Sequence, residues 1–476
     1  MEESPTISLV SCMHFVKRGV AKAVPEKIEL TEVELANIIK QTASDLKIAE
    51  DGDDQSGSEE EAAASNPADP NDEFNFEKYD EDEQTASVGL ESIATLPNLG
   101  DLGENVQIRT EGGDSDEEDD IIKPNDNLLL VGHVESDASI LEVYVFNHEE
   151  GSFYVHHDMI LPWFPLCIEW LSHDPTDPQP GNLCALGGMD PVIQVWDLDI
   201  ENCLEPAFKL GKKPNKKKKT KRVGHKDAVL DLSWNTNFTH VLASGSADNT
   251  VLLWDLDQGS PHTKLVYFTD KVQTLSFHPR EAQTLLSGSC DGSARVSDCR
   301  TDDAVRSWKL GGEIERVTWD TINPYCFVCN DQGKVFYVDC RNEQPVWTLS
   351  AHEHEVTAVI LSDTCPGLMI TVGTDGKIKT WDTLHGSTTP DCEQATKVGK
   401  TLCASICPDS YTSLAVGGDN KENFIQMVDL TVSEQGMVAY QVSCSCRVQF
   451  LIAPRWGVGL TLGNTGPILF IFKNNV

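Results

Sequence analysis

The chain has 476 residues, 39% of them hydrophobic, and a formal net charge of −39. That hydrophobic content can supply one large core, whereas no stretch approaches the ~20 apolar residues of a membrane-spanning helix and no secretory signal begins the chain. We therefore expect a soluble intracellular protein with no membrane contact. The fifteen cysteines are scattered over apparent strands, which is typical of buried thiols in a reducing compartment.

A predicted strand opens the chain. ISLVSCMHFVKRGVA, within residues 1–22, looks like the first strand of a sheet whose next two strands, DNLLLVGH and ILEVYVFN, come only after an acidic region. Residues 23–126 would then be an insertion inside that first sheet rather than a free arm.

The insertion at 23–126 holds 31 acidic and 6 basic side chains. Runs such as DGDDQSGSEEE cannot bury enough apolar surface to offset chain entropy, so we expect this segment to be mostly disordered. Two interpretations stay open: a solubilising spacer, or a contact surface for basic partners such as histones or basic assembly factors. Three serines with a glutamate three residues on resemble casein kinase II substrates and are candidate phosphosites: Ser56, Ser58 and Ser115.

One ordered island is predicted within the acidic region, at 31–48. Thr31 followed by Glu34 forms a capping box, and apolar residues from Leu35 to Leu46 fall on one helical face. This short amphipathic helix would pack either against the side of the main domain or into a groove of a partner.

From residue 127 to 476 the sequence repeats. An aspartate closes a hydrophobic strand six times, at intervals of 58, 43, 41, 43 and 47 residues: Asp197, Asp255, Asp298, Asp339, Asp382 and Asp429. This is the period of a four-stranded propeller blade. We predict an all-β WD40 β-propeller and favour seven blades with extra closing strands, because this class most often closes at seven. Eight blades remain the alternative, since eight three-strand sets can be counted.

The best repeat, GHKDAVLDLSWNTNFTHVLASGSADNTVLLWD at 224–255, carries the whole WD-repeat signature. In such repeats a buried hydrogen-bonded network braces the blade. We expect His225, a strand serine (Ser244 or Ser246), Asp248 and Trp254 to form it, with a structural role.

Other repeats depart from this pattern. Ser297, Val338 and Val428 stand where Trp196, Trp254 and Trp381 stand elsewhere, so those blades should lose the network and keep the alternating apolar pattern. A second aromatic series lies one strand earlier and should pack into the core rather than form a ligand cage: Trp170, Trp234, Phe277 and Trp319.

A lysine-rich loop at 212–222 lengthens one repeat interval. It holds eight basic side chains: Lys212, Lys213, Lys216, Lys217, Lys218, Lys219, Lys221 and Arg222. A nuclear import signal, contact with nucleic-acid phosphates and a solvated loop all fit, and import fits best. Without interleaved aromatic residues, any nucleic-acid binding would be salt-sensitive and unspecific.

We expect a binding scaffold and no enzyme, because GxSxG, Walker and HExxH patterns are missing from the sequence. His156 and His157 form the most reactive-looking cluster, but strand alternation would point them to opposite faces. A structural zinc site needs four ligands, usually two cysteine pairs on loops. The pair Cys326 and Cys329 lies in an apparent strand, and Cys444 and Cys446 have no second pair of similar spacing. We therefore expect no metal, no cofactor and no small-molecule substrate.

Several stretches resemble the periodic tryptophan protein 1 family of WD-repeat proteins. They are VKRGVAK (16–22), KPNDNL (123–128), SFYVHHD (152–158), PVIQVWDLDI (191–200), AVLDLSWN (228–235), ASGSADNTVLLWD (243–255), DKVQTLSFHP (270–279), EAQTLLSGS (281–289) and IERVTW (314–319). With the acidic insertion and the lysine loop, the resemblance covers the chain to about residue 385. It implies a nuclear and nucleolar protein that contacts histones and chromatin and supports ribosomal RNA gene transcription and ribosome biogenesis.

A different class of function stays open, that of a substrate-receptor adaptor for a cullin–RING ubiquitin ligase. Such propellers resemble one another in a WDxR motif. Asp298-Cys299-Arg300 and Asp339-Cys340-Arg341 match its last three positions, while Ser297 and Val338 replace the tryptophan.

Overall fold

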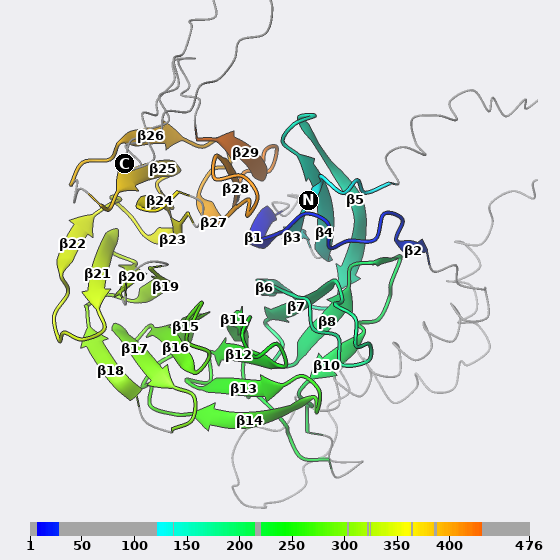
Figure 1. Cartoon of the computed structure of the whole chain (residues 1–476), viewed down its shortest axis with the longest axis horizontal. Coiled ribbons are helices and arrows are strands. Elements are labelled where there is room, and N and C mark those ends of the chain that lie inside the picture. Colours follow the sequence, from blue (N-terminus) through cyan, green and yellow to red (C-terminus); the bar gives the residue numbers. More distant parts are fainter. Residues whose placement is uncertain are drawn as a thin grey trace, which may run out of the picture. The chain divides into compact units, whose positions relative to one another are not determined.

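The computed structural model in Figure 1 describes residues 7–27, 121–136, 138–214, 220–301, 304–320, 323, 325–362, 365–384 and 388–430. Regular structure in these ranges is β-strand throughout. No helix in them is long and apolar enough to cross a membrane. The predicted helix at 31–48, the acidic runs and the candidate phosphosites lie outside the described residues.

The strands form seven antiparallel sheets, the blades of a propeller, which Figure 1 shows arranged in a ring. Blade 1 contains β1 (Ser8–Val16), β3 (Asn127–Glu135), β4 (Ala138–Asn147) and β5 (Ser152–Leu161). Blade 2 contains β6 (Pro165–Leu171), β7 (Leu183–Gly188), β8 (Ile193–Asp197) and β10 (Phe208–Leu210). Blade 3 contains β11 (Val229–Trp234), β12 (Val241–Ser246), β13 (Val251–Asp255) and β14 (Ser260–Leu265).

The remaining blades follow in chain order. Blade 4 contains β15 (Val272–Phe277), β16 (Thr284–Ser289), β17 (Ser293–Asp298) and β18 (Ala304–Lys309). Blade 5 contains β19 (Ile314–Trp319), β20 (Tyr325–Asn330), β21 (Lys334–Asp339) and β22 (Trp347–Ser350). Blade 6 contains β23 (Val356–Leu361), β24 (Leu368–Gly373), β25 (Lys377–Asp382) and β26 (Cys392–Ala395). Blade 7 contains β27 (Thr401–Ile406), β28 (Ser413–Gly418) and β29 (Ile425–Asp429). The predicted β-propeller is confirmed, and each of the six repeat aspartates ends the third strand of its blade.

Blade 1 is built from two distant segments. Its innermost strand β1 pairs antiparallel with β3, so that Phe15 lies opposite Leu129. The segments flanking the long insertion also meet, because the amide of Ile122 donates a hydrogen bond of 2.9 Å to the carbonyl of Ala23. A short strand, β2 (Glu26–Lys27), then pairs in parallel with β9 (Ile200–Glu201), which follows β8 of blade 2.

The hydrophobic core lies between the blades rather than within one of them. Seven clusters of buried apolar side chains occur in the described residues, and each joins two neighbouring blades. Sheets packed face to face need small residues where the backbones come closest. A Cβ added to Gly187 on β7 would lie 2.7 Å from the Val229 side chain of the next blade.

The ring closes directly between blade 7 and blade 1. One of the seven clusters joins Val10 and Phe15 of β1 to Cys403 of β27, and the amide of Phe15 donates a hydrogen bond of 3.1 Å to Ser405 Oγ. The amide of Arg18 also donates a bond of 2.9 Å to Asp409 Oδ2, in the loop after β27. Since these two blades pack against each other, the ring has no place for an eighth, and the favoured count of seven is confirmed.

Candidate interaction sites of the propeller

The four residues predicted to brace the best repeat lie together in blade 3. His225 approaches Asp248 Oδ1 through Nδ1 at 3.2 Å and Ser244 Oγ through Nε2 at 2.7 Å. Trp254 Nε1 donates a hydrogen bond of 2.8 Å to the same serine oxygen. Ser244 and not Ser246 therefore occupies the strand position. All four side chains are buried, so the network can stabilise the blade but cannot bind a ligand directly.

The charge of Asp248 is held in place by this network. Burial alone would raise the pKa of Asp248, but hydrogen bonds from His225 and Thr250 hold it well below its usual range. The aspartate is therefore ionised at neutral pH, and it also accepts a hydrogen bond of 2.8 Å from the amide of Lys226. The network thus fixes the backbone that enters β11.

The lysine-rich loop begins and ends beside that network. Lys212 and Val223 form an isolated antiparallel bridge, with N–O distances of 2.8 and 3.1 Å, which closes the loop at its base. Gly224 follows with a φ of +99°, and a Cβ there would lie 2.8 Å from the Trp254 ring. Arg222 Nη1 donates to the carbonyl of His225 at 3.1 Å. Of the eight basic residues, Lys212, Lys213, Lys221 and Arg222 are described, and Lys216, Lys217, Lys218 and Lys219 lie outside the described residues.

A second complete network occurs in blade 6 and was missed in the sequence. His352 approaches Asp375 at 3.0 Å and Thr371 Oγ1 at 2.8 Å, and Trp381 Nε1 donates to the same threonine oxygen at 3.0 Å. Ala351 precedes this histidine in place of the expected glycine. The spacing from histidine to aspartate to tryptophan is the same as in blade 3, and this signal would have located it.

Blade 2 keeps the tryptophan without the network. Trp196 is 1% exposed, and its Nε1 has no hydrogen-bond partner among the described residues. The second aromatic series packs inward, as Trp234, Phe277 and Trp319 are buried and Trp170 is half-buried. The ring nitrogens of the three tryptophans donate to nearby acceptors, as when Trp319 Nε1 donates to the carbonyl of Ser276 at 2.9 Å. These rings form no open aromatic cage.

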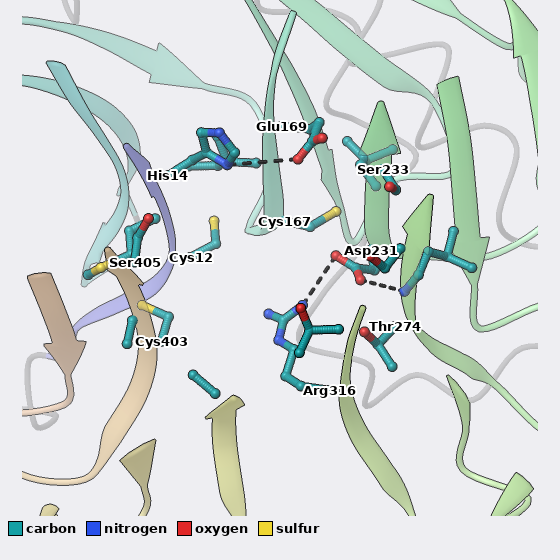
Figure 2. Close-up of a pocket in the computed structure, with 18 of the residues that line it drawn as sticks. Cys12, His14, Cys167, Glu169, Asp231, Ser233, Thr274, Arg316, Cys403 and Ser405 are labelled. Atoms are coloured by element: carbon teal, nitrogen blue, oxygen red, sulfur yellow. Dashed lines mark hydrogen bonds and ion pairs between the residues drawn. The ribbon is translucent and has the colours of Figure 1, made fainter. Parts of the chain in front are cut away.

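The innermost strands of all seven blades line a central channel with a cavity of about 360 Å³. Figure 2 shows the polar side chains around it. Arg316 of β19 reaches Asp231 of β11, with 3.2 Å between Nη1 and Oδ1, although blade 4 lies between their two blades. Asp231 Oδ2 also accepts a hydrogen bond of 2.7 Å from the amide of Leu275 on β15. One carboxylate therefore ties three blades together.

A second pair lies on the wall of the same channel, between the adjacent blades 1 and 2. His14 Nδ1 of β1 lies 3.8 Å from Glu169 Oε2 of β6, and Glu169 Oε1 accepts a hydrogen bond of 2.8 Å from the amide of Trp234. Burial raises the pKa of Glu169 to about 8 and lowers the pKa of His14 to about 4. Both groups are therefore largely uncharged at neutral pH, which leaves Asp231 and Arg316 as the charged pair of the cavity.

Three cysteines also line the channel: Cys12, Cys167 and Cys403. Burial raises the pKa of Cys12 to about 12 and holds the pKa values of the other two well above the usual range. They remain thiols at neutral pH, whereas the thiolate is the nucleophile and metal ligand. Elsewhere, Cys326 and Cys329 on β20 are both fully buried and belong to different core clusters, one on each face of blade 5.

The prediction that His156 and His157 point to opposite faces is wrong. Their Nδ1 atoms lie 2.9 Å apart, and their rings are T-shaped at 82°. The reason is a β-bulge, because Val143 pairs with His157 and Tyr144 with Val155, which leaves His156 as an extra residue in β5. Burial and the neighbouring His156 lower the pKa of His157 to about 4.

Two arginines of the partial WDxR motifs lie on adjacent blades. Arg300 Nε donates to Asp298 Oδ1 at 2.9 Å, and Arg341 Nε donates to Asp339 Oδ1 at 2.9 Å. Each side chain is 66% exposed, so the two guanidinium groups are presented at the surface while their own aspartates orient them.

Comparison of the sequence with known proteins shows which families this chain is similar to. Residues 216–255 and 343–382 match the family described as WD domain, G-beta repeat, and these segments include the two complete networks. The periodic tryptophan protein 1 homolog of Drosophila melanogaster is 44% identical over 433 residues, which cover 87% of this chain and 93% of that protein. Periodic tryptophan protein 1 of Saccharomyces cerevisiae is 30% identical over 501 residues, covering 87% of each chain.

A more distant similarity covers less of the molecule. The ribosome biogenesis protein WDR12 homolog of Drosophila mojavensis is 27% identical over 206 residues, which cover 41% of this chain and 47% of that protein. Because the two closer matches extend over most of both chains, the protein belongs to the periodic tryptophan protein 1 family.

Proposed function

We propose that this protein is a non-enzymatic scaffold that acts in ribosome biogenesis in the nucleus and nucleolus. The observation that carries the proposal is the similarity along nearly the whole chain to periodic tryptophan protein 1. The partial similarity to a protein named for ribosome biogenesis supports it. Assembly factors of the ribosome are accordingly the first class of partner.

The finer form of the proposal is that the protein binds chromatin through histones and supports ribosomal RNA gene transcription. Charge supports this choice, because the 31 acidic side chains of residues 23–126 complement a basic partner. The hydrogen bond between Ile122 and Ala23 joins the two ends of this segment, and the pairing of β2 with β9 attaches its first residues to the loop after β8 of blade 2.

Nuclear import is the proposed role of the lysine-rich loop. Its base is fixed by the bridge between Lys212 and Val223, next to the buried network of blade 3. Import receptors recognise such runs of basic residues, and phosphate contact is a second use of the same charge.

A scaffold rather than a catalyst fits the chemistry of the channel. Its thiols are held protonated, Glu169 and His14 are largely uncharged, and Asp231 and Arg316 neutralise each other. No group among these combines a nucleophile with an adjacent base, which nucleophilic catalysis requires.

The proposal is tested by chromatin immunoprecipitation with sequencing of the tagged protein, together with imaging. Wild type should be enriched over ribosomal DNA and concentrated in nucleoli. A variant with Lys216, Lys217, Lys218 and Lys219 changed to alanine should lose the nuclear signal. A matched control changes four exposed lysines elsewhere to alanine, Lys226, Lys264, Lys271 and Lys400, and should stay nucleolar. A cytoplasmic wild type without enrichment would overturn the proposal.

A second candidate, an adaptor for a cullin–RING ubiquitin ligase, draws on the exposed and similarly oriented Arg300 and Arg341. Affinity purification separates the two. Recovery of a cullin adaptor that is lost in the double variant Arg300→Ala/Arg341→Ala would favour the ligase, whereas recovery of pre-ribosomes favours the scaffold.

A further inference from the structure

A buried cluster of two histidines and a glutamate lies where blade 1 meets the loop after β8 of blade 2. The β-bulge at His156 turns both imidazole rings to one side of β5, with 2.9 Å between their Nδ1 atoms. Glu201 comes from β9, and its Oε1 lies 3.7 Å from His156 Nδ1. The ligand atoms of the three residues all lie within 4.8 Å of one another.

The cluster is enclosed and incompletely hydrogen-bonded. The side chain of His156 is 1% exposed and that of Glu201 is 8% exposed. Glu201 Oε1 and His157 Nε2 are buried without a hydrogen-bond partner among the residues that the structure describes. A buried carboxylate oxygen without a donor is costly, and a cation between it and the imidazoles would remove that cost.

The distances fit a tetrahedral metal ion. Zinc binds imidazole nitrogen at about 2.0–2.1 Å and carboxylate oxygen at about 2.0–2.2 Å, which places neighbouring ligand atoms roughly 3.3 Å apart in a tetrahedron. The separations of 2.9 and 3.7 Å bracket that value. Two histidines and one glutamate are a ligand set that zinc uses when it keeps a fourth position for water.

The second carboxylate oxygen of Glu201 is already engaged. Lys27 of β2 places Nζ 3.5 Å from Oε2, and its side chain is 46% exposed. Oε1 is thus the oxygen directed at the histidines, which favours ligation through one oxygen. The imidazole nitrogens disfavour calcium and magnesium, which take oxygen ligands.

We propose that His156, His157 and Glu201 form a binding site for a divalent transition metal ion, with zinc as the ion that fits best. The ion would link β5 of blade 1 to β9, which is paired with β2 at the start of the acidic insertion. It would therefore fasten two neighbouring blades and the strand that leads into the insertion. This site is independent of the proposed function in ribosome biogenesis.

The test uses the full chain after treatment with a chelator, titrated with Zn²⁺ by calorimetry and followed by thermal unfolding. Wild type should bind one tight equivalent and unfold at a higher temperature with the metal. Glu201→Gln and His156→Gln should each weaken that binding by about 100-fold or more. The exposed His262→Gln serves as a matched control and should bind as wild type does.

Two further measurements distinguish the proposed site from zinc binding by cysteines and from misfolding of the variants. Replacing zinc by Co²⁺ should give a tetrahedral spectrum without thiolate charge-transfer bands, which cysteine ligands would produce. Without metal, Glu201→Gln should be at least as stable as wild type, because it removes a buried carboxylate, and only wild type should gain stability from zinc. Equal binding by wild type and Glu201→Gln, a thiolate spectrum, or no tight binding by wild type would each overturn the proposal.

Discussion

Arg316 and Asp231 form an ion pair across the central channel, with 3.2 Å between Nη1 and Oδ1. The pair joins blade 5 to blade 3 and passes over blade 4, whose Leu275 amide donates to the same carboxylate. A contact between blades that are not neighbours adds a restraint that the seven core clusters cannot supply, since each cluster joins adjacent blades. The ion pair should therefore matter for stability of the ring.

Changing Arg316 to leucine should lower the free energy of unfolding by about 2 kcal/mol. Burial already raises the pKa of Asp231, and without the guanidinium that opposes this rise the carboxyl must either stay charged without its partner or take up a proton. The double variant Asp231→Asn/Arg316→Leu should recover at least half of that loss, since the asparagine oxygen can still accept from the amide of Leu275. Urea unfolding measures both, with the exposed Arg306→Leu as control. A double variant that loses the sum of the effects of Arg316→Leu and of the single variant Asp231→Asn would show that the pair has no coupling.

Glu169 should make stability depend on pH. Its folded pKa of about 8 lies above the usual value of 4.5, so the folded state holds the proton more tightly than the unfolded chain does. The resulting stability is fully present below about pH 4.5 and is lost as pH rises through about 8, with a slope of at most about 1.4 kcal/mol per pH unit.

Glu169→Gln should remove this dependence, because glutamine is neutral at every pH and can still accept from the amide of Trp234. Thermal unfolding from about pH 5 to pH 9 should show that the stability of the variant rises relative to that of wild type as the pH increases. The exposed Glu149→Gln should follow the wild-type curve. Parallel curves for wild type and Glu169→Gln would contradict the assignment.

The fold could be predicted from the sequence repeat because each repeat corresponds to one blade of the propeller. Each closing aspartate ends a third strand, and the signature of residues 224–255 predicts the network of His225 and Trp254. The network of His352 could also have been found, since its spacing repeats that of blade 3. Local spacing is thus enough for the two networks, because all four residues of each lie within one blade.

Features that join separate blades could not be predicted in this way. Arg316 and Asp231 lie 85 residues apart, and only closure of the ring brings them together. His156 and Glu201 lie close together because of a β-bulge in β5 and the pairing of β9 with β2. Neither feature can be recognised from the alternation of apolar and polar residues in the sequence. Alternation gave the wrong orientation for His156 because it assumes an unbroken register.

Two buried tryptophans at equivalent positions offer a direct measure of the network. Trp254 donates a hydrogen bond of 2.8 Å to Ser244, whereas Trp196 has no partner for Nε1 among the described residues. Both side chains are almost fully buried. Trp254→Phe should therefore cost about 1–3 kcal/mol more than Trp196→Phe, because only the first leaves a buried hydroxyl oxygen, that of Ser244, short of a donor. Equal losses of unfolding free energy would mean that packing alone explains both.

The acidic insertion should be removable without loss of the propeller. Its flanks are already joined by the hydrogen bond between Ile122 and Ala23, and the pairing of β1 with β3 lies outside the replaced segment. Residues 30–118 replaced by a flexible linker of about 20 residues should leave a chain that unfolds cooperatively near the wild-type temperature, since loop length changes closure entropy only slowly. Circular dichroism and calorimetry check this. As a matched control, deleting residues 1–16 should abolish cooperative unfolding, because β1 forms the inner strand of blade 1 and contributes Val10, Met13 and Phe15 to the closing core cluster. If the linker variant failed to fold while the β1 deletion folded, the closure of the ring through β1 would be refuted.

The same linker variant tests which part of the chain binds the basic partner. If it folds and keeps nucleolar localisation but loses histone binding, the acidic segment and not the propeller binds that partner.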